Sequence, residues 1–204
     1  MTDQNNSMAN MASQICNQIQ SVFSQVTAEQ SALDVMVEEI AGAAARKGRV
    51  FVHGVGREGL MLKALCMRLA HLGLSAHCVG DMTTPPISFQ DLLVTSAGPG
   101  GFSTIDAICG VARSIGARVL LLTAQKSGSA AQYATAIAFL PAQTMADDHG
   151  GSDDDGQLSS RHLLPMGSLY EGVMFVLFEM VVFRLAEALD QTPEAIRSRH
   201  TNLE

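Results

Sequence analysis

A glycine-rich turn between an apolar run and a helical pattern is the first place where this sequence could do chemistry. The run at 92–94 would form a buried strand, and the turn after it reads Ser96-Ala-Gly-Pro-Gly-Gly-Phe-Ser103-Thr104. Hydroxyl groups and exposed backbone N–H groups at the start of a helix attract phosphate and other anions. The same residues also suit a purely structural turn, and Pro99 removes one N–H donor. The turn therefore predicts either an anion-binding loop or a simple connection.

The strand expected at 49–56 ends in a second glycine-rich loop, which reads Gly54-Val-Gly56-Arg57-Glu-Gly59. This spacing matches the G-x-G-x-x-G dinucleotide pattern, but no acidic residue ends the next strand to bind a ribose. Neither loop is followed by the Gly-Lys-Ser or Gly-Lys-Thr sequence that a P-loop requires. The two loops therefore favour a small phosphorylated ligand over a nucleotide. Glycines at these positions would equally serve close packing of a strand on a helix.

The elements that would position these loops alternate between strand and helix patterns. Such alternation predicts a parallel sheet with helices on both faces. The helix at 57–73 is expected to turn Leu60, Ala64, Met67 and His71 towards apolar surroundings. Strands are predicted at 49–56, 75–80, 91–96, 117–124 and 135–142, and helices at 57–73, 101–116 and 129–134, with two more within 15–45, one at 168–189 and a short one from Thr192.

Bulk composition excludes several classes of protein. The chain has 204 residues, of which 47% are hydrophobic and 16% charged, so it is globular and long enough for a sizeable core. A net charge of −7 without a basic run argues against a nucleic-acid partner. The longest apolar stretch, 173–189, contains Glu179 and Arg184 and predicts a buried or interface helix, not a membrane span. That helix favours association into dimers or tetramers.

Cysteine usage and the acidic segment point to no metal centre. Cys16, Cys66, Cys78 and Cys109 lack CxxC spacing, which favours reduced thiols and a cytoplasmic location. Five Asp residues fall between 147 and 155, beside His149. Closely spaced acidic residues in a polar loop are more often solvated charges than ligands, so we expect no metal here.

Several motifs, kept in order over 49–204, resemble those of the sugar isomerase (SIS) domain and, within it, the 6-phospho-3-hexuloisomerases. The resemblance rests on the loop Gly54-x-Gly56-Arg57-x-Gly59, the helix segment Met67-Arg-Leu-Ala-His71-Leu-Gly73, the strand exit Val79-Gly80 with Thr84-Pro85, the segment LLPMGSLYE at 163–171 and the ending RHTNLE.

The resemblance implies an α/β fold of the SIS type, a three-layer αβα sandwich around a five-stranded parallel sheet, which is flavodoxin-like. It also implies assembly, usually into a homotetramer. It implies a single domain over 1–204, with N-terminal helices within 1–45, a long Asp-containing loop at 141–165 and C-terminal helices within 166–204. The family needs no cofactor and acts on a small sugar phosphate. Its reaction interconverts 3-hexulose 6-phosphate and fructose 6-phosphate by base-catalysed proton transfer through an enediol.

Residue roles follow from the same resemblance. Glu171 matches the family's base, and His200 matches a C-terminal histidine that could assist ring opening or proton transfer, including across a subunit interface. The residues that would bind the substrate and its phosphate are Gly54, Gly56, Arg57, Ser96, Gly98, Ser103 and Thr104.

Two departures from the family pattern fall in the phosphate loops. The family's Ser-Gly-Ser-Gly-x-Thr becomes a loop with Gly98 and Pro99, and the serine after Arg57 becomes Glu58. A carboxylate beside a phosphate lowers affinity unless it points away or pairs with Arg57. A SIS-fold protein that binds a sugar phosphate without turnover, or an isomerase of a different sugar, is therefore the alternative. The enzyme hypothesis requires Glu171 to face the same cleft as Ser96 and Ser103.

Overall fold

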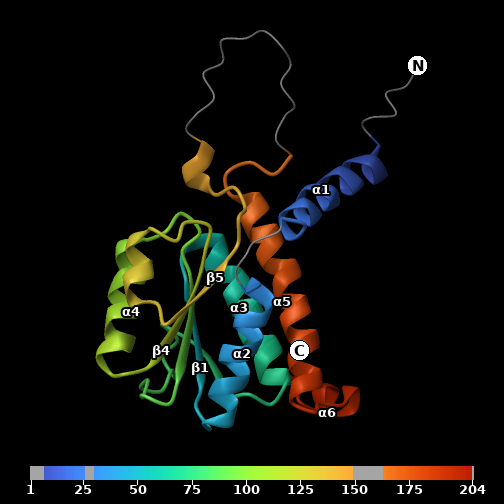
Figure 1. Ribbon diagram of the computed structural model, residues 1–204. Helices are drawn as coiled ribbons and strands as arrows, with labels where there is room; N and C mark the ends of the chain where they lie inside the picture. Colours follow the sequence, from blue (N-terminus) through green and yellow to red (C-terminus); the bar gives the residue numbers. More distant parts are fainter. Residues whose placement is uncertain (1–6, 26–29, 149–162, 204) are drawn as a thin grey trace, which may run out of the picture.

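The computed structural model describes residues 7–25, 30–148 and 163–203, and these form an α/β structure around a parallel sheet (Figure 1). The sheet order is β2-β1-β3-β4-β5, and all neighbouring strands are parallel. This is the flavodoxin-like order, so the predicted fold class is confirmed. The strands are β1 (Val50–Gly54), β2 (Ala76–Cys78), β3 (Leu92–Ser96), β4 (Arg118–Thr123) and β5 (Ala136–Phe139).

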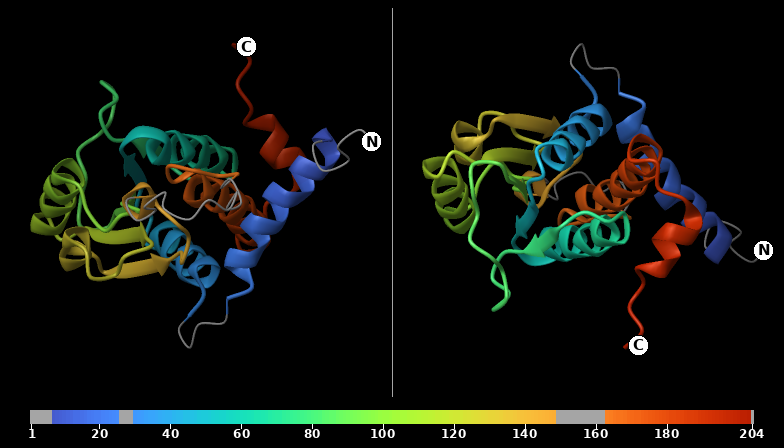
Figure 2. Two further views of the ribbon diagram at one scale, coloured as in Figure 1. Left: turned by 90° about the horizontal axis from the view of Figure 1, so that it is seen from above. Right: turned by 90° about the horizontal axis from the view of Figure 1, so that it is seen from below.

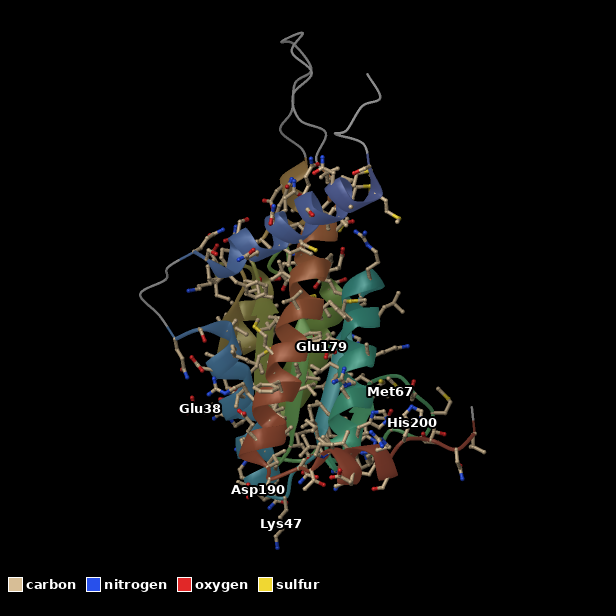
Figure 3. All side chains as sticks on the ribbon, turned by 90° about the vertical axis from the view of Figure 1, so that its right-hand side faces the viewer. Glu38, Lys47, Met67, Glu179, Asp190 and His200 are labelled. Carbon is tan, nitrogen blue, oxygen red and sulfur yellow. The ribbon has the colours of Figure 1, made fainter. Side chains whose placement is uncertain are left out.

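Helices cover both faces of the sheet, as the alternation predicts (Figure 2). One face carries α4 (Ser103–Ser114) and the short 3-10 helix η2 (Ser129–Tyr133). The other face carries α2 (Ala32–Ala45) and α3 (Gly56–His71). The long helix α5 (Ser168–Ala188) lies between α2 and α3, on the side seen in Figure 3. Its apolar residues complete the larger of two buried clusters.

The remaining elements lie at the ends of the helical layer. Helix α1 (Met8–Phe23) packs against α5 and projects beyond the sheet, and α6 (Pro193–Ser198) follows the C-terminal end of α5 (Figure 1). A 3-10 turn, η3 (Met145–Asp148), interrupts the long connection that the sequence predicts at 141–165. No helix among the described residues is long and apolar enough to cross a membrane.

The register of the two central strands positions the site. β1 and β3 pair from Val50↔Leu92 to Gly54↔Ser96, so the two glycine-rich loops leave the sheet side by side. After β1 the chain turns to β2 on one side and then crosses to β3 on the other, which makes this edge the topological switch point. Ligands of open α/β sheets bind outside the carboxyl ends of strands at such points.

One prediction about α3 is wrong. Leu60, Ala64 and Met67, expected on the apolar face, are exposed, Leu60 by 59% and Met67 by 54%, while the buried residues are Leu62, Leu65 and Leu69. The helix carries apolar residues at helical spacing on two faces, so periodicity alone could not choose between them. The tight turn from β1 into α3 fixes which face meets the sheet.

Candidate active site

A cavity of about 420 Å³ lies at the carboxyl ends of β1 and β3. It is bounded by the β1–α3 loop, by the residue that precedes α4, by η3 and by the start of α5. Its lining residues are Val55, Gly56, Arg57, Glu58, Phe102, Met145, Met166 and Glu171. One cationic and two acidic side chains thus share a cleft with apolar walls, a composition typical of small-molecule sites.

The first glycine-rich loop is shaped by a close approach of backbone to backbone. A Cβ atom at Gly59 would lie 2.4 Å from the carbonyl oxygen of Gly54. A residue with a side chain therefore fits neither at position 54, in the strand, nor at position 59, in the helix. Gly56 adopts a φ of 58°, and a Cβ there would meet nothing within 4 Å. Gly54 and Gly59 therefore serve close packing of strand on helix, the role that the sequence offered as an alternative to ligand binding. Gly56, in contrast, borders the cavity.

Arg57 joins this loop to the segment before α5. Its Nη1 donates to Ser168 Oγ at 2.9 Å, and its Nη2 donates to the carbonyl oxygen of Met166. Nη2 also lies 3.2 Å from Glu171 Oε2. Met166 and Gly167 both adopt left-handed backbone conformations, with φ of 54° and 78°. A non-glycine residue in this region is strained, and such strain is often found at functional sites.

Glu171 projects into the cavity from the first turn of α5, and its side chain is 16% exposed. Burial raises the pKa of the Glu171 carboxyl; Arg57 opposes this effect, and the nearby Glu58 adds to it. Oε2 is buried and accepts no hydrogen bond from the described residues, although it lies beside the Arg57 guanidinium. A carboxylate that is little solvated and free to accept a proton suits a general base.

Glu58 was expected either to point away from the phosphate loop or to pair with Arg57, and it does neither. It is 7% exposed, and its Oε2 accepts hydrogen bonds from Ser96 Oγ at 2.6 Å and from the Gly98 N–H at 3.0 Å. The carboxylate therefore neither points away from the phosphate loop nor pairs with Arg57. Burial raises the pKa of the Glu58 carboxyl, while the hydrogen bonds from Ser96 and Gly98 lower it.

Tyr170 completes this hydrogen-bonded group, and the sequence did not single it out. Its phenol oxygen lies 3.3 Å from Ser96 Oγ. Because Ser96 donates its own proton to Glu58, the phenol must be the donor in this contact. Burial first, and then the charge of Glu58, raises the pKa of Tyr170, which keeps that proton in place. Its place beside Glu171 in the motif at 163–171 was the available signal.

The predicted phosphate-loop residues fall into two groups. Ser96 and Gly98 are held at the end of β3 by Glu58, while Ser103 and Thr104 are exposed on the first turn of α4. The residue preceding α4 is Phe102, which lines the cavity and offers no side-chain cap. The N-terminal turn of α4 therefore begins at the cavity wall. Glu171 and Glu58 line the same cavity, whereas Ser96 is fully buried against Glu58 and Ser103 lies just beyond Phe102 on α4, so the cleft shared with Ser96 and Ser103 that the enzyme hypothesis requires stays a prediction.

The structure does not bring His200 to Glu171 within one chain. An α-helix rises about 1.5 Å per residue, so the two ends of α5 lie about 30 Å apart. Glu171 is near its first end, and His200 follows α6 at the other (Figure 3). There the His200 ring stacks on His71, with ring centroids 5.3 Å apart.

The acidic segment is described only in part. Asp147 accepts hydrogen bonds from the N–H and hydroxyl of Thr144, at 2.7 and 2.9 Å, and so closes a local turn. Asp148 ends η3, and the following positions 149–162, with His149 and Asp153–Asp155, lie outside the described residues. Among residues 7–25, 30–148 and 163–203 there is no group of three or more potential metal ligands.

Comparison with known proteins agrees with this architecture. No family model matches the chain. The crystal structure of a hypothetical protein from Methanococcus jannaschii, from which a function of 3-hexulose-6-phosphate isomerase was inferred, superposes with a TM-score of 0.75 at 24% identity. It covers 93% of this chain and 97% of that one, which establishes the fold.

Sequence comparison identifies closer relatives. The 3-hexulose-6-phosphate isomerase of Bacillus subtilis is 32% identical over 156 residues, covering 76% of this chain and 80% of its own. The enzyme of the same name from Mycobacterium gastri is 39% identical over 157 residues, covering 77% of this chain and 74% of its own. With this identity over most of both sequences, the chain belongs to the 3-hexulose-6-phosphate isomerase family.

Proposed function

We propose that this protein interconverts 3-hexulose 6-phosphate and fructose 6-phosphate, with Glu171 as the general base. The observation that carries the proposal is the position of Glu171 in the cavity, where its Oε2 lies 3.2 Å from Arg57 Nη2 and accepts no hydrogen bond from the described residues. The names of the relatives support the choice of substrate, and the position of Glu171 in the cavity supports its assignment as the base.

The chemistry requires one carbon-bound proton to move. Glu171 would remove the proton from C2 of the 3-keto sugar, leaving a 2,3-enediolate with its charge on O3. A proton then passes from O2 to O3 by way of the enediol, and Glu171 would return its proton to C3 as the carbonyl forms at C2. Negative charge develops on the sugar oxygens during this transfer. The Arg57 guanidinium, already 3.2 Å from the Glu171 carboxylate, would stabilise that charge.

The phosphate would fix the sugar with respect to Glu171. The proposal assigns it to the mouth of the cavity, where Gly56 and Arg57 begin α3 and where Ser103 and Thr104 begin α4. Backbone N–H groups of two helix starts and one guanidinium suit a dianion. A fixed phosphate holds C2 near the base, which accounts for much of the rate of such reactions.

The direct test is turnover by the purified protein. Supplied with 3-hexulose 6-phosphate, it is expected to form fructose 6-phosphate, followed by a coupled assay or by NMR, and to run in reverse. The unphosphorylated hexulose should be a poor substrate, because it cannot use the anion-binding part of the cavity. Turnover of the free sugar alone would indicate an isomerase of a different substrate. Binding without turnover would indicate the non-catalytic alternative.

We also propose that the protein is a cytoplasmic homo-oligomer, a dimer or a tetramer, in which His200 reaches the site of a neighbouring copy. Four unpaired cysteines among the described residues suit a reducing compartment. The neighbouring helices α3 and α5 expose large apolar side chains, which suit a second copy of the chain. They are Leu60, Met67, Phe175 and Phe183, exposed by 54–64%.

Light scattering of the full chain tests the oligomer. We expect the mass of a dimer or tetramer at micromolar concentration, and a smaller species after Phe175→Glu, because a charge would be buried in the interface. Val111→Glu is the matched control, since Val111 is similarly exposed (54%) but lies on α4, across the sheet. A monomer at all concentrations would contradict the proposal, as would an equal effect of both substitutions.

A further inference from the structure

Two hydrogen-bond donors at the end of β3 form a ready-made anion site. Ser96 is the last residue of the strand, and its hydroxyl and the N–H of Gly98 point at one oxygen atom. Converging donors at the carboxyl edge of a parallel sheet are a common way to bind phosphate. Here the oxygen atom that they hold belongs to the chain itself. It is Oε2 of Glu58, at 2.6 Å from the hydroxyl and 3.0 Å from the N–H.

Within 7–25, 30–148 and 163–203, no positively charged side chain forms an ion pair with Glu58. Arg57, its neighbour in sequence, is turned to Ser168, Met166 and Glu171. The Glu58 carboxylate is held by the neutral hydroxyl of Ser96 and the backbone N–H of Gly98. The Tyr170 phenol in turn donates to the Ser96 hydroxyl. These are the donors that a phosphate oxygen would use, and they are already engaged.

The space beside the donors is also filled. A Cβ atom at Gly98 would lie 3.1 Å from Glu58 Oε1, 3.1 Å from Tyr170 Cε1 and 3.2 Å from Thr144 Cγ2. Even the smallest side chain at this position would force its neighbours to move. Glu58 and Gly98 therefore complement each other, because the carboxylate occupies the volume that a larger residue 98, or a ligand, would need.

We propose that Glu58 is the specificity-determining residue of this cleft, an internal anion that fills the Ser96–Gly98 donor pair and excludes phosphate from it. Free inorganic phosphate then finds no deep site. The phosphate group of a substrate binds farther out, at the mouth of the cavity. The sugar part of that substrate then occupies the cavity beside Glu171. This placement of the substrate rests on the proposed function. The occupation of the Ser96–Gly98 donor pair by Glu58 does not.

The experiment measures binding of inorganic phosphate to the full chain by calorimetry, without any sugar and without turnover. Glu58→Ser removes both the charge and the volume, and Glu58→Gln keeps the volume and an oxygen that can accept from Ser96 and Gly98. We expect Glu58→Ser to bind phosphate about tenfold more tightly than the wild type, because two donors become free for a charged ligand. Glu58→Gln should gain at least threefold less than Glu58→Ser, since the donors stay occupied.

Two controls make the outcome decisive. Glu187→Ser removes a carboxylate from the exposed side of α5 and should leave phosphate affinity unchanged, which measures the effect of net charge alone. Adding Ser96→Ala to Glu58→Ser should abolish the gained affinity, because one donor is lost. Thermal unfolding and circular dichroism verify the fold of each variant.

Equal affinities of Glu58→Ser and Glu58→Gln would overturn the proposal, as would no gain in Glu58→Ser or a gain that survives Ser96→Ala. In the first case the effect is charge alone, and in the others phosphate does not use these donors. Failure of the wild type to isomerise 3-hexulose 6-phosphate would contradict the proposed function and leave this binding result as it stands.

Discussion

Replacement of Glu171 by glutamine is expected to lower kcat by about 10²–10⁴-fold, the range lost when a general base is removed. Glutamine has nearly the same shape, and its amide oxygen can keep the contact with Arg57, so KM and the fold should change little. The amide cannot accept the proton from C2. Steady-state kinetics with 3-hexulose 6-phosphate measure the change, and Glu187→Gln, an exposed residue of the same helix, is the matched control. Retention of more than about a tenth of the activity would assign the proton transfer to another group.

The pH profile provides a second measurement of the same role. A general base acts in its ionised form, so kcat/KM should rise with pH as Glu171 loses its proton. Burial raises the pKa of Glu171, which places this rise above the pH at which an ordinary glutamate titrates. Glu58 adds to the upward shift, so Glu58→Gln should move the acidic limb to lower pH. A limb that does not move in this variant would show that the titrating group is not close to Glu58.

The second large effect concerns stability. Gly59→Ala is expected to destabilise the protein by about 3 kcal/mol, the upper range for overpacking, because the new Cβ would lie 2.4 Å from the carbonyl oxygen of Gly54. The obstacle is backbone, which cannot rotate away as a side chain can. Relief requires β1 and α3 to separate at the point where the cavity begins. Urea unfolding measures the free-energy difference.

Gly110→Ala is the matched control for this substitution. Gly110 also lies inside a helix, α4, but a Cβ there would meet only the Tyr133 ring at 3.5 Å, an ordinary contact. Alanine favours the helix, so a gain of about 0.5–1 kcal/mol is expected. If both substitutions change stability by the same amount and sign, helix propensity and not the close approach of Gly54 and Gly59 is the controlling factor.

The sequence was sufficient to predict the sheet because its strands carry strong local signals. β3 and the apolar part of β4 read as uninterrupted apolar or β-branched runs, as expected of strands buried on both faces. The intervening helices fix parallel pairing, and the resemblance supplies the strand order. The short helix expected at 129–134 is present as a 3-10 helix over Ser129–Tyr133.

The orientation of α3 and the partners of Glu58 could not be predicted in the same way. Both depend on contacts between residues far apart in sequence: Glu58 meets donors at 96 and 98, about forty residues later. From its charge alone, the Glu58 carboxylate was expected either to pair with Arg57 or to point away from the phosphate loop. The geometry of the β1–α3 turn instead directs the carboxylate inward, and Arg57 is engaged by a segment more than one hundred residues away.

The in-register pairing of β1 and β3 also sets where the chain can change in length during evolution. An insertion of one residue within either strand would displace one loop by about 3.3 Å and reverse the alternation of its side chains. Gly54 would no longer lie opposite Ser96, and Glu58 would lose its donors. The connection between β2 and β3 exposes Met82 and Phe89 by 97% and 70%, but it is also fixed, because Thr84 Oγ1 donates to the carbonyl oxygen of Cys78 and Arg49 Nη2 donates to that of Pro86. Among relatives, the ends of β1 and β3 should therefore keep a constant length, and insertions and deletions should fall outside them.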